Sequence, residues 1–97
     1  ARGDLGNVMP LSELPKVQAY IAKVCKEHNK NFMVVTQMLD SMIRNPYPTR
    51  AEVNDIYHAV HQGANALMLT GETAHGRYPV EAMKMLVETA NGSLEEL

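Results

Sequence analysis

The sequence predicts an α/β fold with parallel strands. Two short apolar runs, FMVVT and ALMLT, alternate with amphipathic segments in the order loop, helix, strand, helix, strand, helix. Apolar residues at consecutive positions are typical of strands covered on both faces. Strands that alternate with helices favour parallel pairing through right-handed crossovers. With 97 residues, the chain amounts to one domain or less.

The first helix is expected between Ser12 and Lys30. Ser12 is a suitable N-cap, Pro15 fits the first helical turn, and Asn29 and Lys30 suit a C-terminus. Apolar residues recur in this segment at three- and four-residue spacing, which marks one face of a helix. That face comprises Val17, Tyr20, Ile21, Val24 and Cys25.

The second and third helices carry boundary signals. TRAE is a capping box, in which Thr49 accepts a backbone N–H near Glu52 and Glu52 reaches back. Gly63 is expected just after the end of this helix. Pro79 is expected to begin the third helix and Gly92 to follow it, while the tail after Gly92 can continue the helix or fray. The apolar faces comprise Val53, Ile56, Tyr57 and Val60 in the second helix, and Val80, Met83, Leu86, Val87 and Ala90 in the third.

The connections are predicted as a helical turn over residues 37–43 and a loop over residues 71–78. Two buried strands and three helices cannot cover all of each other's faces and edges. The chain is therefore expected to be a piece of a larger α/β domain, or to assemble with copies of itself.

Composition argues against two classes of partner. A formal net charge of −2, with 21% charged residues, gives no electrostatic reason to expect nucleic acid or an anionic membrane surface. No apolar run is long enough to span a bilayer. A single cysteine, Cys25, cannot form an internal disulfide, so the cytoplasm is the expected compartment.

Three polar stretches are expected at one end of the sheet, where the chemistry of parallel α/β folds takes place. They are ARGD before the first helix, TQ after the first strand and TGET after the second. Gly3 allows a ligand to approach the backbone, and successive amides can hold an anion. Asp4 can serve as one of the few carboxylates that Mg²⁺ needs. Thr36 and Thr70 supply hydroxyls that can bond a substrate oxygen or join a proton relay.

Simpler interpretations exist for each of these residues. Asp4 can be a turn residue between glycines, and Arg-Gly-Asp also occurs as a short cell-adhesion signal, although nothing here resembles a secretion signal. Thr36 and Thr70 can simply cap the turns that follow the strands. His58 and His61, three residues apart on the second helix, can be an exposed helix edge, since no third metal ligand is apparent.

Four motifs together carry a family resemblance. ARGDLG, TQMLDSM, NPYPTRAEV and GANALMLTGETAHGRYPVEA follow one another as in pyruvate kinase. The chain, residues 1–97, resembles the last part of that family's catalytic barrel, from the end of the sixth strand through the eighth helix. The resemblance implies a portion of a TIM (β/α)8 barrel with about two and a half β-α units and parallel strands.

The resemblance also implies an activity. The family transfers a phosphoryl group from phosphoenolpyruvate to ADP, giving pyruvate and ATP in glycolysis, with Mg²⁺ or Mn²⁺ and usually K⁺. It places a metal ligand on Asp4, substrate-binding amides on Gly3 and Asp4, and a substrate contact on Thr36. It also places Thr70 near the family's proton-transfer path, at a position where the family commonly has serine.

Three further roles follow from the same resemblance. Arg2 and Glu72 are expected to support the site, and Arg50 to act across a subunit contact, which makes the parent enzyme a homo-oligomer. The family's catalytic lysine, second metal carboxylate and K⁺ ligands have no counterpart here, so the chain alone is expected to be inactive. The alternative is a non-catalytic, self-associating α/β module that retains an anion-binding loop and satisfies its strand edges with a partner chain.

Overall fold

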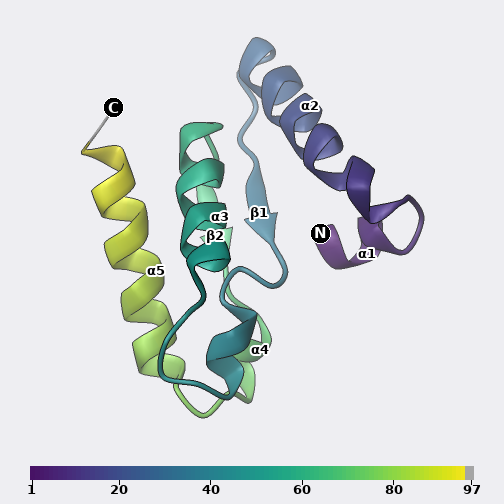
Figure 1. Ribbon diagram of the computed structural model, residues 1–97. Coiled ribbons are helices and arrows are strands. Elements are labelled where there is room, and N and C mark those ends of the chain that lie inside the picture. Colours follow the sequence, from purple (N-terminus) through teal and green to yellow (C-terminus); the bar gives the residue numbers. More distant parts are fainter. Residues whose placement is uncertain (96–97) are drawn as a thin grey trace.

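The computed structural model describes residues 1–95 and confirms the predicted α/β order (Figure 1). Its strands are short and its three long helices line one side of them. In chain order, the α-helices and strands are α1 (Arg2–Gly6), α2 (Leu14–Glu27), β1 (Met33–Val35), α3 (Arg50–His61), β2 (Ala66–Met68), α4 (Gly71–Ala74) and α5 (Pro79–Leu94). There are also two 3₁₀ turns among the described residues, η1 (Leu11–Glu13) and η2 (Asp40–Ile43). The second lies within the helical turn predicted over residues 37–43.

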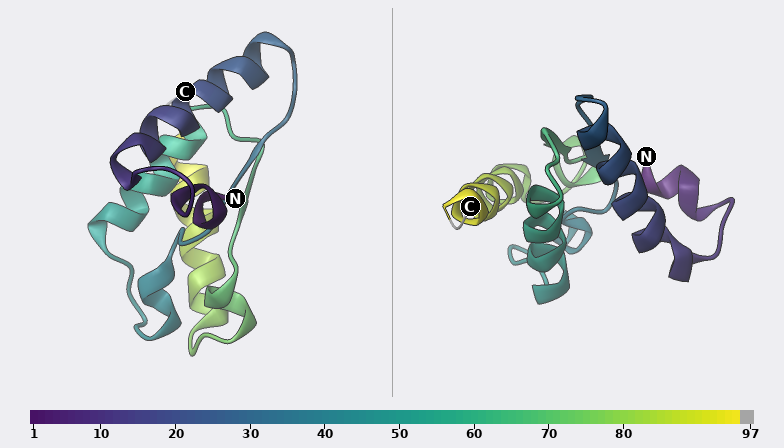
Figure 2. Two further views of the ribbon diagram at one scale, coloured as in Figure 1. Left: turned by 90° about the vertical axis from the view of Figure 1, so that its right-hand side faces the viewer. Right: turned by 90° about the horizontal axis from the view of Figure 1, so that it is seen from above.

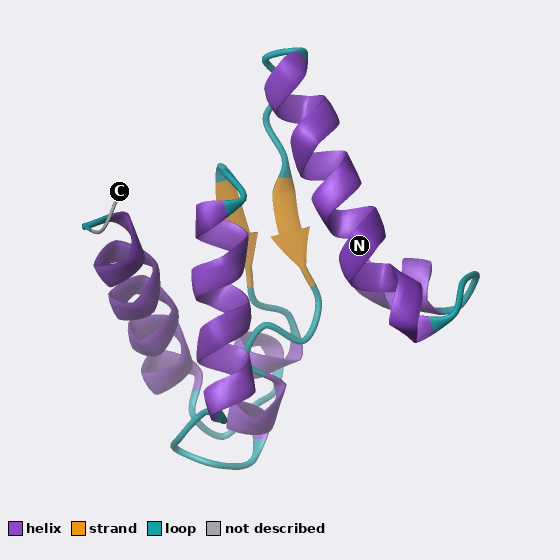
Figure 3. Ribbon diagram, turned by 45° about the horizontal axis from the view of Figure 1, so that its top comes forward, coloured by secondary structure: helices purple, strands orange, loops and turns teal. Residues whose placement is uncertain are grey.

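The two strands pair in parallel, with Val34 opposite Leu67. Because side chains alternate between the faces of a strand, these two residues lie on one face, and Val34 is buried beneath the helices. Met33 and Met68 lie on the other face and are 48% and 40% exposed. Residues 1–95 therefore cover only the helix-facing side of the sheet, in agreement with the expectation that these helices cannot cover both faces (Figure 3).

The hydrophobic core lies between the sheet, α3 and α5. Seen from above, α3 lies between α2 and α5 (Figure 2), and its tightest packing is against α5. Burial of this apolar surface is the main stabilising term of the fold. The buried residues of the core are Val34, Met38, Leu39, Met42, Ile56, Ala59, Leu69, Ala82 and Leu86.

Helix α2 is much less buried than α3 or α5. It buries a single residue completely, Ala22, and Tyr20 of its predicted apolar face is 67% exposed. A side-chain hydrogen bond of 2.8 Å from Gln18 Nε2 to Gln62 Oε1 joins it to the end of α3. The amphipathic pattern of α2 thus marks a face that residues 1–95 cover only in part.

Two helix boundaries are confirmed. The backbone N–H of Glu52 donates to Thr49 Oγ1 at 3.2 Å and that of Thr49 donates to Glu52 Oε1 at 2.8 Å, which completes the capping box. Gly63 follows α3 with φ +92°, a conformation that favours glycine.

Two other predicted boundaries are wrong. Ser12 lies inside the 3₁₀ turn and caps nothing; α2 begins at Leu14, with Pro15 in its first turn. Gly92 does not end the last helix, which continues to Leu94. An exposed helical glycine costs about 1 kcal/mol relative to alanine. Burial of Ser93, whose hydroxyl donates to the Thr89 carbonyl at 2.7 Å, helps to offset that cost.

The apolar face of α5 also differs from the prediction. Ala82 and Leu86 face the core, whereas Val80, Met83 and Val87 are 63%, 44% and 47% exposed. The three exposed side chains form a stripe on the outer side of the helix. None of the helices over residues 1–95 has the length and apolar character needed to cross a membrane.

Candidate functional site

The carboxyl ends of the strands converge with α1. Thr36 directly follows β1, and Leu69 and Thr70 follow β2, so the parallel register places these turns side by side. Gly3 of α1 lies against Thr36: a Cβ at Gly3 would be 3.1 Å from Thr36 Cγ2. A cavity of about 480 Å³ opens at this junction, lined by Arg2, Gly3, Gly6, Asn7, Leu11, Leu14, Thr36, Gln37 and Asp55.

The ARGDLG stretch is a short helix rather than the predicted turn. The N–H of Leu5 donates to the Ala1 carbonyl at 3.1 Å, which closes a helical turn over Arg2–Gly6. The prediction failed because two glycines lower helix propensity, whereas packing against α2 and Thr36 favours the helix here. The amides of Gly3 and Asp4 lie in the first turn, where a helix supplies no carbonyl acceptor of its own.

The turn after β1 has a strained backbone. Thr36 and Gln37 have φ values of +85° and +58°. Positive φ in a β-branched residue such as Thr36 is an outlier, and each such residue costs about 1 to 3 kcal/mol. The surrounding structure must therefore hold this turn in place.

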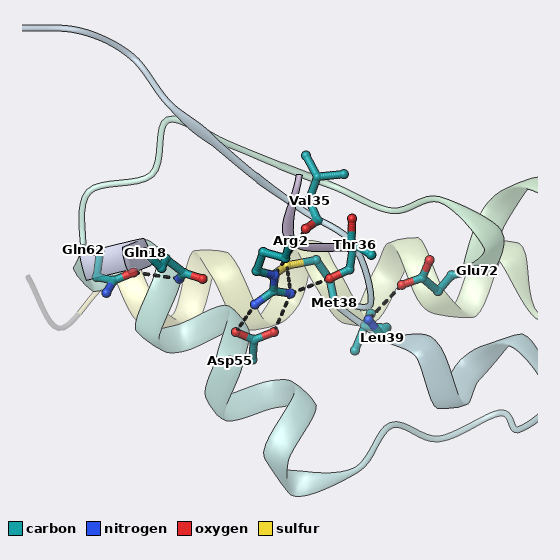
Figure 4. A network of polar contacts seen from close by, with 9 residues as sticks. All are labelled: Arg2, Gln18, Val35, Thr36, Met38, Leu39, Asp55, Gln62 and Glu72. Carbon is teal, nitrogen blue, oxygen red and sulfur yellow. Dashed lines mark hydrogen bonds and ion pairs between the residues drawn. The ribbon is translucent and has the colours of Figure 1, made fainter. Parts of the chain in front are cut away.

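The Arg2 side chain provides one such contact (Figure 4). Its Nε donates to the Val35 carbonyl at 3.2 Å and its Nη2 to the Thr36 carbonyl at 2.6 Å. Nη2 also lies 3.2 Å from Met38 Sδ. The same guanidinium makes a bidentate pair with Asp55 of α3, at 2.8 and 2.9 Å.

Glu72 links the two strand-end turns. Its side chain is buried, and its Oε2 accepts the backbone N–H of Leu39 at 2.9 Å. Its Oε1 accepts the backbone N–H of Thr70 at 2.9 Å and lies 3.4 Å from the Thr70 hydroxyl. Glu72 belongs to the one-turn helix α4, which replaces the first part of the loop predicted over residues 71–78. Each oxygen of a single carboxylate thus satisfies a backbone amide of a different turn.

A second carboxylate holds the chain that leads from β1 to α3. Glu52 accepts hydrogen bonds from both the backbone N–H and the hydroxyl of Ser41, besides that of Thr49 in the capping box. Partial burial raises the pKa of Glu52, but the hydrogen bonds from Ser41 and Thr49 outweigh it, so the net pKa lies below the ordinary value.

The structure brings most of the predicted site residues together and leaves Asp4 and Arg50 apart from them. Arg2, Gly3 and Thr36 line one cavity, and Glu72 binds Thr70 to the turn that begins at Thr36. Asp4 is exposed on α1 and does not line that cavity. Arg50 is exposed as the first residue of α3.

Asp4 has the character of a ligand for a hard cation. Within residues 1–95 its carboxylate makes no hydrogen bond or ion pair, and it is exposed. Mg²⁺ binds through one or two carboxylates and takes its other ligands from water and substrate oxygens. No group of three His, Cys, Asp or Glu side chains gathers into a metal cluster among the described residues. Asp4 fits a shared metal site of this kind and does not form a closed one.

Neither histidine of the second predicted helix joins a metal cluster of the described chain. His61 stacks on Tyr57, with ring centroids 4.1 Å apart, and His58 lines a groove between α2 and α3. This favours the interpretation of an exposed helix edge.

No sequence pattern points to Asp55. It lies inside α3 at a position that reads as an ordinary polar helix residue. Its partner, Arg2, is 53 positions away in the sequence. A contact over that distance leaves no local pattern, so only the folded chain reveals it.

Comparison with known proteins identifies the family. The family described as "Pyruvate kinase, barrel domain" matches residues 1–83. The chain is 52% identical to pyruvate kinase of Thermotoga maritima over 97 residues, which is all of this chain and 21% of that protein. It is 54% identical to pyruvate kinase isozyme G, chloroplastic, of Nicotiana tabacum over 86 residues, 89% of this chain and 15% of that protein.

A solved structure agrees. The crystal structure of a pyruvate kinase from Cryptosporidium parvum superimposes with a TM-score of 0.98 at 36% identity, over 100% of this chain and 20% of that one. The chain thus spans about a fifth of the length of the first relatives that it matches. Its fold is a portion of a (β/α)8 barrel with parallel strands. The chain belongs to the pyruvate kinase family, and it corresponds to part of that family's barrel domain.

Proposed function

We propose that residues 1–97 form the segment of a pyruvate kinase barrel that runs from the end of the sixth strand through the eighth helix. In the full-length enzyme this segment contributes to phosphoryl transfer from phosphoenolpyruvate to ADP. The supporting observation is the convergence of Gly3, Thr36 and the Thr70–Glu72 turn at the carboxyl ends of parallel strands. The exposed Met33 and Met68 agree with a sheet face that further barrel strands cover.

In this proposal α1 and Thr36 hold the substrate. The amides of Gly3 and Asp4 bind the substrate carboxylate, and the Thr36 hydroxyl contacts the substrate from the opposite wall. The Asp4 carboxylate binds Mg²⁺ or Mn²⁺, which neutralises charge on the transferred phosphoryl group. K⁺ is held by residues outside this chain. The contribution of this segment is therefore positioning and charge neutralisation.

Thr36 and Thr70 have a second proposed role. After phosphoryl transfer the enolate of pyruvate must be protonated, and we assign Thr36 and Thr70 to order the water that delivers the proton. The hydrogen bond from the Thr70 backbone N–H to Glu72 fixes the turn that carries this hydroxyl. Glu72 supports the site in this way without contacting the substrate.

The proposal also covers the oligomeric state, compartment and partners of the enzyme. Arg50, exposed at the start of α3, is assigned to a subunit contact of a homo-oligomer. The enzyme is placed in the cytoplasm, with nucleotides and small acids as its ligands and neither nucleic acid nor membrane as a partner. The 97-residue chain alone is expected to be inactive, since Asp4 can supply only part of a metal site.

Replacing Asp4 tests the proposed function. Loss of even an outer partner of a metal ligand costs about 10- to 100-fold in affinity, so Asp4→Ala should weaken Mn²⁺ binding more than about 100-fold. The measurement is Mn²⁺ titration of the full-length enzyme by electron paramagnetic resonance. Glu13→Gln, which alters an exposed carboxylate in a surface ion pair, is the matched control and should bind Mn²⁺ as the parent does. Undiminished binding by Asp4→Ala would remove Asp4 from the metal shell.

The non-catalytic, self-associating module remains the second candidate because of the exposed sheet face. Met33 and Met68 present apolar surface, and each strand of the two-stranded sheet has one unpaired edge among the described residues. Light scattering on the 97-residue chain separates the candidates. A discrete, stable oligomer supports the module, whereas a disordered monomer or an aggregate supports a barrel segment.

A further inference from the structure

We propose that Asp55 is a positioning residue, which acts through Arg2 to hold the Thr36–Gln37 turn and thereby to place the Thr36 hydroxyl. The inference rests on the proposed function, which makes Thr36 a substrate contact. It adds a residue that neither the sequence motifs nor the site assignments include. Asp55 is also far from the turn in sequence, and its carboxylate accepts hydrogen bonds from Arg2.

The turn needs an external constraint because its backbone is strained. Two consecutive residues other than glycine, Thr36 and Gln37, have positive φ. Strained backbone of this kind persists only where the surrounding contacts enforce it, and it is concentrated at functional sites. Without such contacts the turn would relax toward a more favourable conformation, and Thr36 would leave its position against Gly3.

The Arg2 guanidinium is suited to supply the constraint. It donates to the carbonyls of Val35 and Thr36, which are the last acceptor of β1 and the first of the turn. These bonds fix where β1 ends and how the Thr36 peptide is oriented. A guanidinium is planar, with donors in a rigid fork, so fixing its plane also fixes the directions of those bonds.

Asp55 fixes that plane. Its two carboxylate oxygens accept from Nη1 and Nη2 of Arg2, a bidentate geometry that leaves the guanidinium little freedom to rotate. The side chains are only 17% and 27% exposed, which limits competition from water. The backbone of Asp55 is held in place because its neighbour, Ile56, is completely buried in the hydrophobic core between α3 and the sheet.

The other end of the turn has its own anchor. Leu39, two residues after Gln37, donates its backbone N–H to the buried Glu72. The turn is thus held at its first carbonyls by a cation and at its last amide by an anion. Removal of Asp55 releases only the first of these, so the expected effect is displacement of Thr36 with the core left intact.

The first experiment compares Asp55→Asn with the parent in the full-length enzyme. A displacement of about 1 Å at a reacting group can cost about 100-fold, so kcat/KM for phosphoenolpyruvate should fall by about 10- to 100-fold. Mn²⁺ affinity should change by less than about threefold, because Asp4 makes no contact with Asp55. The control is Lys16→Gln, which breaks an exposed ion pair with Glu13 and should leave kcat/KM unchanged. An Asp55→Asn enzyme that is folded and retains full kcat/KM overturns the proposal.

A double-mutant cycle separates positioning from simple stabilisation. If Asp55 acts through Thr36, then Asp55→Asn should lower kcat/KM by less than about threefold when Thr36 is already alanine. An equal loss in both backgrounds would mean that Asp55 acts independently of Thr36. Arg2→Lys, which keeps the charge but not the fork, should reproduce the loss, and it provides a second route if Asp55→Asn does not fold.

A crystal structure of the Asp55→Asn enzyme tests, independently of activity, whether Asp55 and Arg2 hold the Thr36–Gln37 turn. The expected result is a Thr36–Gln37 turn that has left its positive φ values, with Gly3 and Glu72 in place. A turn that keeps its positive φ values in Asp55→Asn overturns the proposal that Asp55 and Arg2 hold it, whatever the activity. Failure of the proposed function looks different: Thr36→Ala would keep full activity while the turn still relaxes in Asp55→Asn.

Discussion

The turns after β1 and β2 carry the same kind of residue and are built in different ways. Each presents a threonine at the carboxyl end of its strand, Thr36 in one and Thr70 in the other. The second turn is fixed from within its own motif, since Glu72 binds the backbone N–H only two residues before it. The first turn has two positive φ values and depends on Arg2, more than thirty residues away. A local motif can therefore specify one half of this site, whereas the other half requires contacts between distant parts of the chain.

The largest expected effect comes from Glu72→Ala, which removes the hydrogen bonds that join the two turns. It leaves the backbone N–H of the buried Leu39 without an acceptor, and it removes the acceptor of the Thr70 N–H, whose hydrogen bond is only partly buried. A buried donor without a partner costs about 1 to 3 kcal/mol and a hydrogen bond near water about 1 kcal/mol, so protection should fall by about these amounts at the Leu39 and Thr70 amides. Hydrogen exchange at the Leu39 and Thr70 amides is the measurement. Unchanged protection at both would contradict the role of Glu72 as a link.

Asp55→Asn is expected to affect one turn and spare the other. Breaking a partly buried charge pair costs less than breaking a fully buried one, so we expect a loss of about 1 to 2 kcal/mol. Hydrogen exchange should quicken over residues 36–38, while the Thr70 amide keeps its protection. Faster exchange at both turns would mean that they are not held independently.

Glu52 extends the comparison along the chain that follows the first turn. Hydrogen bonds from Ser41 and Thr49 lower the pKa of Glu52 in the folded protein. A carboxyl with a depressed pKa contributes stability above its unfolded pKa, about 4.3, and this stability is lost as the pH falls through the lower folded value.

Glu52→Gln should therefore destabilise the protein by about 1 kcal/mol at neutral pH through loss of the cap. It should also weaken the acid-induced loss of stability. Thermal unfolding from pH 7 to pH 3 measures both effects. A parent and a variant with parallel pH profiles would contradict the assignment.

The smallest effect concerns the strain itself. Gln37 has φ +58°, so glycine relieves about 1 to 2 kcal/mol of strain but loses more entropy on folding, about 0.5 to 1 kcal/mol. Gln37→Gly should raise the free energy of unfolding by about 0.5 kcal/mol. In combination with Asp55→Asn, it should reduce the loss of stability that Asp55→Asn causes. A matched change with the opposite sign is Gly63→Ala, since Gly63 has φ +92°. Denaturant unfolding of the three variants checks both signs.

Local features of the fold could be predicted from the sequence because their signals lie within a few residues. The capping box of Thr49 and Glu52 and the glycine at position 63 are examples, and both are confirmed. Ser12 and Gly92 carry equally local signals, yet packing overrides them: α2 begins after a 3₁₀ turn, and α5 continues past its glycine. Local preference is a weak term wherever tertiary contacts compete with it.

The candidate site was predictable to a similar extent. The motif resemblance singled out Gly3, Thr36 and Glu72, and the structure brings Gly3 against Thr36. The strain at Thr36 and the contribution of Asp55 could not be predicted, because they depend on backbone geometry and on a contact between distant positions. The open face of the sheet was expected, because two strands with apolar residues on both faces have too few helices to cover them.

The most direct test of the central claim is a crystal structure of the full-length enzyme with Mg²⁺ and phosphoenolpyruvate bound. The account predicts an Asp4 oxygen about 2.0 to 2.1 Å from the metal. It also predicts the substrate carboxylate on the amides of Gly3 and Asp4, with the Thr36 hydroxyl in hydrogen-bond contact with the substrate. A metal and a substrate that lie away from α1 and from the turn after β1 would contradict it.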